Sequence, residues 1–167
     1  MSDSLPEPWM RGPLPGIEPL VQPVFFSFMM VREDLAKFTQ GITQEQLWRR
    51  IEPVASLGFH LRHIAGSVDR LSTYLVNAQL TPEQLAFLKD EPTPGATLSE
   101  LLTAIDLTLA STESRLRTLD PASIHDPRYI GRKRLPTTVL GLLVHIAEHT
   151  QRHLGQAITT AKLVQAA

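Results

Sequence analysis

The chain has 167 residues, of which 43% are hydrophobic and 20% charged, a composition typical of a globular domain and not of a disordered segment. Its formal net charge of −1 argues against a broad nucleic-acid surface, because such a surface needs excess Lys and Arg to displace counterions from phosphates. The lack of cysteine excludes disulfides, zinc–thiolate sites and a cysteine nucleophile supplied by this chain.

Residues 1–18 contain four prolines and two glycines with no hydrophobic period, which predicts an extended N-terminal arm. Trp9 and Met10 would allow this arm to pack against the domain or a partner. No membrane-spanning segment is predicted, since the most apolar stretch, residues 20–31, is too short. The N-terminus also lacks the features of a secretory signal, so we expect a cytoplasmic protein with no membrane partner.

Thirteen prolines divide the rest of the chain, because a proline inside a helix costs about 3 kcal/mol. The first long helix is predicted over residues 19–40, where apolar residues recur at helical spacing and Gly41 can serve as C-cap. Thr43 and Gln46 form the pattern of a capping box, which predicts a short helix that reaches Trp48.

The second long helix is predicted to follow Pro53, with Ser56 as N-cap, and to end near residue 77. A short helix over 81–89 and a loop over 90–95 come next. The third long helix starts at the capping box of Thr97 and ends by residue 120. The fourth is predicted over 136–163. No segment alternates apolar and polar residues convincingly, so we expect an all-α four-helix bundle over residues 19–164 without strands.

Five of the six histidines lie on two of these predicted helices. His60 and His63 are three residues apart on the second, and His145, His149 and His153 are spaced by four on the fourth. Side chains spaced by four residues project from one face of a helix, one turn apart. The same row of the fourth helix carries residues typical of a core, namely Leu142, Ile146, Ala157 and Thr160. Both helices are therefore expected to direct imidazoles into the bundle.

Several buried imidazoles are hard to satisfy by hydrogen bonds alone, because each ring has two nitrogens and burial disfavours its charged form. A divalent metal resolves this problem, since neutral imidazole is a good ligand for zinc, nickel or iron. Three nitrogen ligands also leave at least one position open for water or substrate. A haem with histidine ligands is an alternative, although it usually takes one ligand from each of two helices.

His149 and His153 are the best pair of metal ligands, and periodicity favours His60 and His63 almost equally as the third. His145 is expected to support a ligand or to line the cavity. Gln156 could hydrogen-bond a ligand imidazole or a metal-bound water. Glu148 points about 100° away from His149, so we assign it to the solvated face.

Two segments carry a resemblance to a known family. Residues 145–156, HIAEHTQRHLGQ, resemble the H-x-x-x-H-x-x-H-H-x-G-Q motif of the DinB-like (DinB/YfiT) superfamily of metalloenzymes. Residues 58–71, GFHLRHIAGSVDRL, resemble the first metal-ligand helix of that family. The resemblance implies a four-helix bundle, often a homodimer, with a zinc or nickel ion on His63, His149 and His153. Arg152 and Leu154 depart from the pattern without touching these ligands.

The better understood members of this family are thiol-dependent S-transferases or isomerases that use a low-molecular-weight thiol. The resemblance therefore implies a metal-dependent transferase acting on a small-molecule substrate. Because this chain has no cysteine, the thiol would have to come from a co-substrate. A metal-dependent hydrolase and a non-catalytic metal-binding or small-molecule-binding bundle are the alternatives. A basic loop before the fourth helix is a candidate for binding carboxylates: Arg128, Arg132, Lys133 and Arg134.

Overall fold

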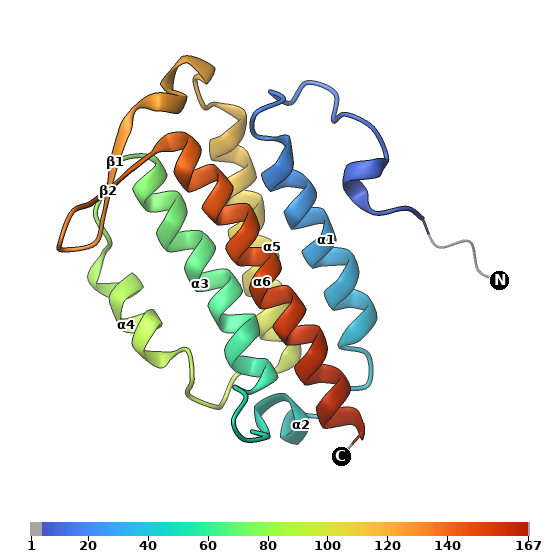
Figure 1. The fold of residues 1–167 in the computed structure, drawn as a ribbon. Helices are drawn as coiled ribbons and strands as arrows, with labels where there is room; N and C mark the ends of the chain where they lie inside the picture. The colour runs from blue at the N-terminus through green and yellow to red at the C-terminus, as the bar shows by residue number, and fades with distance from the viewer. Residues whose placement is uncertain (1–4, 167) are drawn as a thin grey trace.

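Four long helices lie side by side in the computed structural model, which describes residues 5–166 (Figure 1). They are α1 (Gln22–Phe38), α3 (Leu57–Leu75), α5 (Leu98–Arg117) and α6 (Val139–Ala166). Helix α6 packs against α1 and α3, and α5 packs against the same two helices from the other side. The prediction of a mostly helical protein with long helices in these four regions is confirmed. None of the helices within residues 5–166 combines the length and the apolarity needed to cross a membrane.

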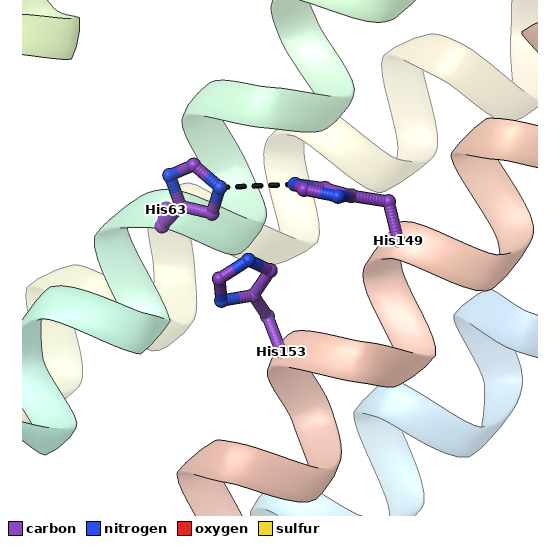
Figure 2. Close-up of side chains that lie close together, drawn as sticks. All are labelled: His63, His149 and His153. Carbon is purple, nitrogen blue, oxygen red and sulfur yellow. Dashed lines mark hydrogen bonds between the residues drawn. The ribbon is translucent and has the colours of Figure 1, made fainter. Parts of the chain in front are cut away.

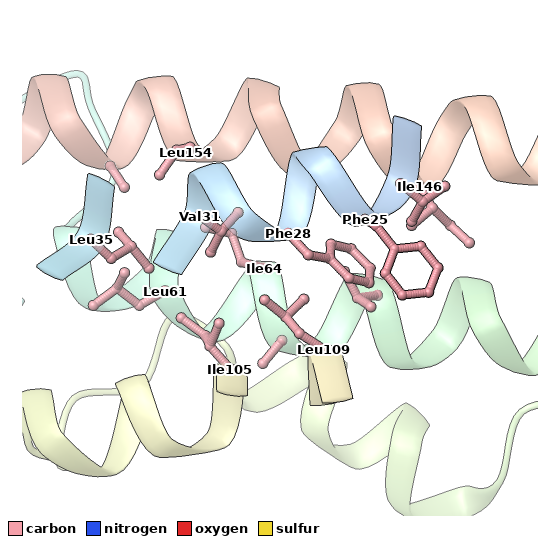
Figure 3. Packing of buried hydrophobic residues seen from close by; sticks show 14 of the residues in the cluster. Phe25, Phe28, Val31, Leu35, Leu61, Ile64, Ile105, Leu109, Ile146 and Leu154 are labelled. Atoms are coloured by element: carbon pink, nitrogen blue, oxygen red, sulfur yellow. The ribbon is translucent and has the colours of Figure 1, made fainter. Parts of the chain in front are cut away.

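One hydrophobic core fills the space between these helices (Figure 3). Each long helix contributes fully buried side chains to it, among them Phe28, Leu61, Leu109 and Ile146. Burial of a large aliphatic or aromatic side chain contributes about 1.5–3 kcal/mol, so this core sets the relative positions of the helices. Helices α3 and α6, which carry the histidines, are thereby held face to face.

Two short helices pack against the long ones, α2 (Gln44–Trp48) against α3 and α6, and α4 (Pro82–Asp90) against the side of α3 (Figure 1). Both short helices start at a capping box, as does α5. In each box a threonine hydroxyl accepts from a backbone N–H three residues later, and that residue's side chain accepts in return. These three helix starts are confirmed at the predicted residues. Ser56 likewise caps α3 by accepting from the Phe59 backbone N–H.

The prediction that the chain has no strands is wrong for residues 127–138. There β1 (Pro127–Ile130) and β2 (Leu135–Thr138) form an antiparallel hairpin in which Tyr129 pairs with Pro136. Each strand has only four residues and each contains a proline, so neither shows a measurable alternation. The turn uses positive φ angles at Gly131 and Arg134. Because Pro136 belongs to the hairpin, α6 begins at Val139 and later than predicted.

The part of the N-terminal arm that the structure describes, residues 5–18, lies beside α1 (Figure 1). It contains the short 3₁₀ helix η1 (Pro8–Met10), and residues 1–4 lie outside the described residues. Arg11 forms two hydrogen bonds to the Glu33 carboxylate, at 2.6 and 2.7 Å. The Gln22 side chain accepts from the Leu14 N–H and donates to the Ile17 carbonyl. These contacts tie the arm to the start and the middle of α1.

The contact between Gly58 and Trp48 gives a test of this packing. A Cβ at Gly58 would lie 2.7 Å from two carbons of the Trp48 ring, which also donates from Nε1 to the Ala96 carbonyl. We expect Gly58→Ala to lower the free energy of unfolding by about 1–3 kcal/mol in urea denaturation, because the ring has to move. Gly155→Ala is the matched control: a Cβ there meets no non-local atom of the described residues within 4 Å, so it should stabilise by up to about 1 kcal/mol. Equal effects of the two changes would contradict this packing.

Candidate metal centre

Three histidines from two helices converge on one point (Figure 2). His63 comes from α3, and His149 and His153 come from successive turns of α6. Each offers one ring nitrogen, and these nitrogens all lie within 4.8 Å of one another. The Nε2 atoms of His63 and His149 are 3.0 Å apart. This spacing allows a single ion to contact all three rings.

The row of residues on α6 explains why two of these rings point inward. Ile146, Leu154 and Ala157 on the same side of the helix are buried in the core. His149 and His153 continue that row at its edge, where both are partly buried. The predicted placement of these two histidines on an inward face of the helix is therefore what the structure shows.

His60 also reaches the cluster, but from the far side of His153. It is 5% exposed, and its Nδ1 lies 3.4 Å from Nδ1 of His153. This contact occupies one nitrogen of the His153 ring, while His153 Nε2 has no hydrogen-bond partner within residues 5–166. Of the two candidates on α3, it is thus His63 that groups with His149 and His153, and His60 lies behind one of them.

Three rings of the cluster, those of His60, His149 and His153, are neutral at neutral pH. Burial, together with neighbouring histidines, lowers the pKa of His60 and of His149 to about 4, and that of His153 to about 3. Neutral rings have lone pairs available for a metal. Neutral imidazoles with closely spaced nitrogens fit a divalent cation with nitrogen ligands.

Glu91 is a site residue that the sequence analysis missed. It follows α4 in the segment predicted as a loop, yet it is only 2% exposed. Its carboxylate accepts from Nδ1 of His63 at 2.6 Å and from Arg70 at 2.8 Å. Burial opposes its ionisation, but these two partners outweigh burial and lower the pKa of Glu91. A charged residue just before two prolines and a glycine carries no local signal of burial, so only the folded chain reveals this contact.

The remaining predicted site residues lie at the rim. His145 is exposed, and its Nδ1 contacts the Glu148 carboxylate at 2.7 Å. Glu148 is exposed, in agreement with its assignment to the solvated face, although a carboxylate oxygen also lies within 4.8 Å of a ring nitrogen of His145 and of His149. Gln156 is exposed and makes no hydrogen bond to any of the described imidazoles. It lines the cavity beside His153 instead.

Two cavities open onto the cluster. The larger, of about 780 Å³, is lined by His60, His153 and Gln156 and by polar and apolar residues of both helices. The smaller, of about 240 Å³, is lined by His63, His145 and His149 and by several leucines. The basic residues of the hairpin line neither of these cavities. Two of them are engaged elsewhere, since Arg128 donates to the Leu75 carbonyl and Arg134 stacks on Tyr129.

The sequence pattern of the DinB superfamily matches residues 28–157, which include all six histidines. The chain belongs to the DinB superfamily. The matched region starts within α1 and ends within α6, so it includes the site and most of the helical body. No curated protein matches the chain. In this DinB-superfamily protein, the resemblance and the geometry point to the same three histidines.

The lowered pKa values predict how the metal-free protein responds to acid. The ordinary histidine pKa of 6.5 applies to the unfolded chain, whereas His60, His149 and His153 titrate near 4, 4 and 3 when folded. Between these values the unfolded chain binds more protons, so the free energy of unfolding should decrease as the pH falls from 6.5 toward 4. Above pH 6.5 these three histidines should not make the free energy of unfolding depend on pH.

Urea unfolding in the presence of a chelator, at pH values from 7.5 to 4.5, measures this effect. His60→Gln removes one of the three titrations and should make the decline shallower. If the free energy of unfolding of the variant fell with pH as steeply as that of the wild-type protein, the His60 imidazole would not be held neutral by its surroundings.

Proposed function

We propose that this protein is a divalent-metal-dependent enzyme that holds zinc or nickel on His63, His149 and His153, inside a four-helix bundle of the DinB type. The observation that carries the proposal is the convergence of three partly buried ring nitrogens within 4.8 Å of one another. Membership of the DinB superfamily supports it. The lowered pKa values of His149 and His153 support it further, because they keep these two rings unprotonated.

We further propose that the reaction is the transfer of a low-molecular-weight thiol to a small electrophile. A zinc or nickel ion on three imidazoles keeps a position open and lowers the pKa of a thiol or water bound there. The chain contains no cysteine, so the sulfur would arrive with a co-substrate. The larger cavity has a volume typical of a small-molecule site and reaches His153. Gln156, Thr159 and Thr160 on its wall supply hydrogen-bonding groups for a polar co-substrate.

Metal analysis of the purified protein tests the site. Protein prepared without chelators should contain about one zinc or nickel ion per chain, as measured by inductively coupled plasma mass spectrometry. His149→Ala and His153→Ala should each lose most of this metal, because a three-nitrogen site cannot lose a ligand without a large loss of affinity. His125→Ala is the matched control, since His125 is exposed at the end of the 3₁₀ helix η2 (Pro121–His125). A wild-type protein that binds no zinc or nickel would refute the proposal.

The thiol reaction is tested with the metal-loaded protein, monochlorobimane as electrophile, and glutathione, bacillithiol or mycothiol in turn. At least one thiol should give conjugation that a chelator abolishes and that zinc or nickel restores. His149→Ala should reduce the rate at least 100-fold, to about the uncatalysed level, while His125→Ala should retain it. Metal-dependent ester hydrolysis without any thiol reaction would indicate a hydrolase. Stoichiometric metal with neither activity would indicate a non-catalytic binding protein.

A further inference from the structure

Side chains of α3 hold Glu91 in one place, although Glu91 lies in a loop. Arg62 donates to the backbone carbonyls of Asp90 and Thr93, at 2.7 and 2.6 Å, and so fixes the turn that carries Glu91. Arg70, two turns further along α3, donates to one carboxylate oxygen of Glu91. The other oxygen is left for His63, which lies between the two arginines in the sequence of the helix.

A glycine makes this close approach possible. A Cβ at Gly66 would lie 2.6 Å from the Oε1 atom of Glu91 and 2.7 Å from Nη1 of Arg70. Real Cβ contacts do not occur at such distances, so a side chain at position 66 would displace the Glu91 carboxylate or the Arg70 guanidinium from this position. The Glu91 carboxylate thus has one defined position, which is set by the turn at 90–93, the two arginines and the absence of a side chain at position 66.

That position has a chemical consequence for His63. An ionised carboxylate only accepts hydrogen bonds, so the ring must carry its proton on Nδ1, the nitrogen that contacts Glu91 at 2.6 Å. A neutral imidazole has a single N–H, and the Nε2 atom is then left with its lone pair. This Nε2 is the atom that faces His149 at 3.0 Å.

We propose that Glu91 is a positioning residue, which fixes the tautomer and the orientation of His63 so that the Nε2 lone pair points into the histidine cluster. The consequence for metal binding rests on the proposed function, whereas the tautomer does not. Carboxylate partners of this kind orient metal-ligating histidines and raise their basicity, and their loss typically lowers metal affinity about 10–100-fold.

A purely structural role for Glu91, as the partner of Arg70, makes a different prediction. A buried ion pair needs only opposite charges in contact, and its removal affects stability. It does not determine which nitrogen of His63 carries the proton. The tautomer of His63 therefore separates the two roles.

The test is long-range ¹H–¹⁵N NMR of the histidine rings in the metal-free protein at pH 7.5, with the His63 signals assigned from a His63→Gln variant. Wild-type His63 should be the Nδ1–H tautomer. In Glu91→Gln, the amide NH₂ can donate to Nδ1, so the population should shift toward the Nε2–H tautomer. Glu100→Gln is the matched control, because Glu100 lies in an exposed capping box where glutamine serves equally well. Its His63 tautomer should be that of the wild type.

Zinc affinity, measured by competition with a chromophoric chelator, is the second readout and should fall about 10–100-fold in Glu91→Gln but not in Glu100→Gln. Gly66→Ala displaces the carboxylate without changing its charge, so it should shift the tautomer in the same direction even if Glu91→Gln folds poorly. An Nε2–H tautomer in the wild type, or a tautomer unchanged in both Glu91→Gln and Gly66→Ala, would overturn the inference. If the wild-type protein binds no zinc or nickel, the proposed function fails, and the tautomer still decides the role of Glu91.

Discussion

The packing of α3 against α6 is the constraint on which the rest of this molecule depends. Both helices bury an apolar row, with Leu61 and Ile64 on α3 and Ile146 and Leu154 on α6 (Figure 3). Hydrophobic burial is not directional, but it fixes which faces of two helices meet. The histidines continue these rows, so the same burial that holds the helices together brings His63, His149 and His153 within 4.8 Å of one another.

This arrangement has an electrostatic cost that the surrounding residues offset. Burial disfavours charged imidazoles and lowers the pKa of His60, His149 and His153. One ring is anchored by Glu91, whose own burial is compensated by Arg70. Another, His153, has His60 behind it. The histidines are thus oriented by residues around the cluster, and two cavities of unequal size reach it.

The sequence predicted the structure correctly where an element depends on interactions between residues that are close together in the chain. The capping boxes at Thr43, Thr81 and Thr97 need only residues three positions apart, and all three start helices as predicted. The long helices also lie where the spacing of the prolines predicts them, because a proline disrupts a helix through its own turn. The hairpin at 127–138 was missed because its stability comes from pairing across a turn and from the contact of Arg128 with the Leu75 carbonyl, neither of which leaves a period in the sequence.

The sequence by itself determined the helices, the inward row of α6 and the family, because helical periodicity places residues four apart on one face whatever the tertiary fold. It could not decide between His60 and His63, since residues three apart diverge by about 60° and the rotation of α3 about its axis depends on its packing partners. It gave no sign of Glu91 at all. That carboxylate reaches His63 only because the chain reverses after α4 and lies against α3 at Gly66, 25 residues earlier, and such a contact between distant residues exists only in the tertiary structure.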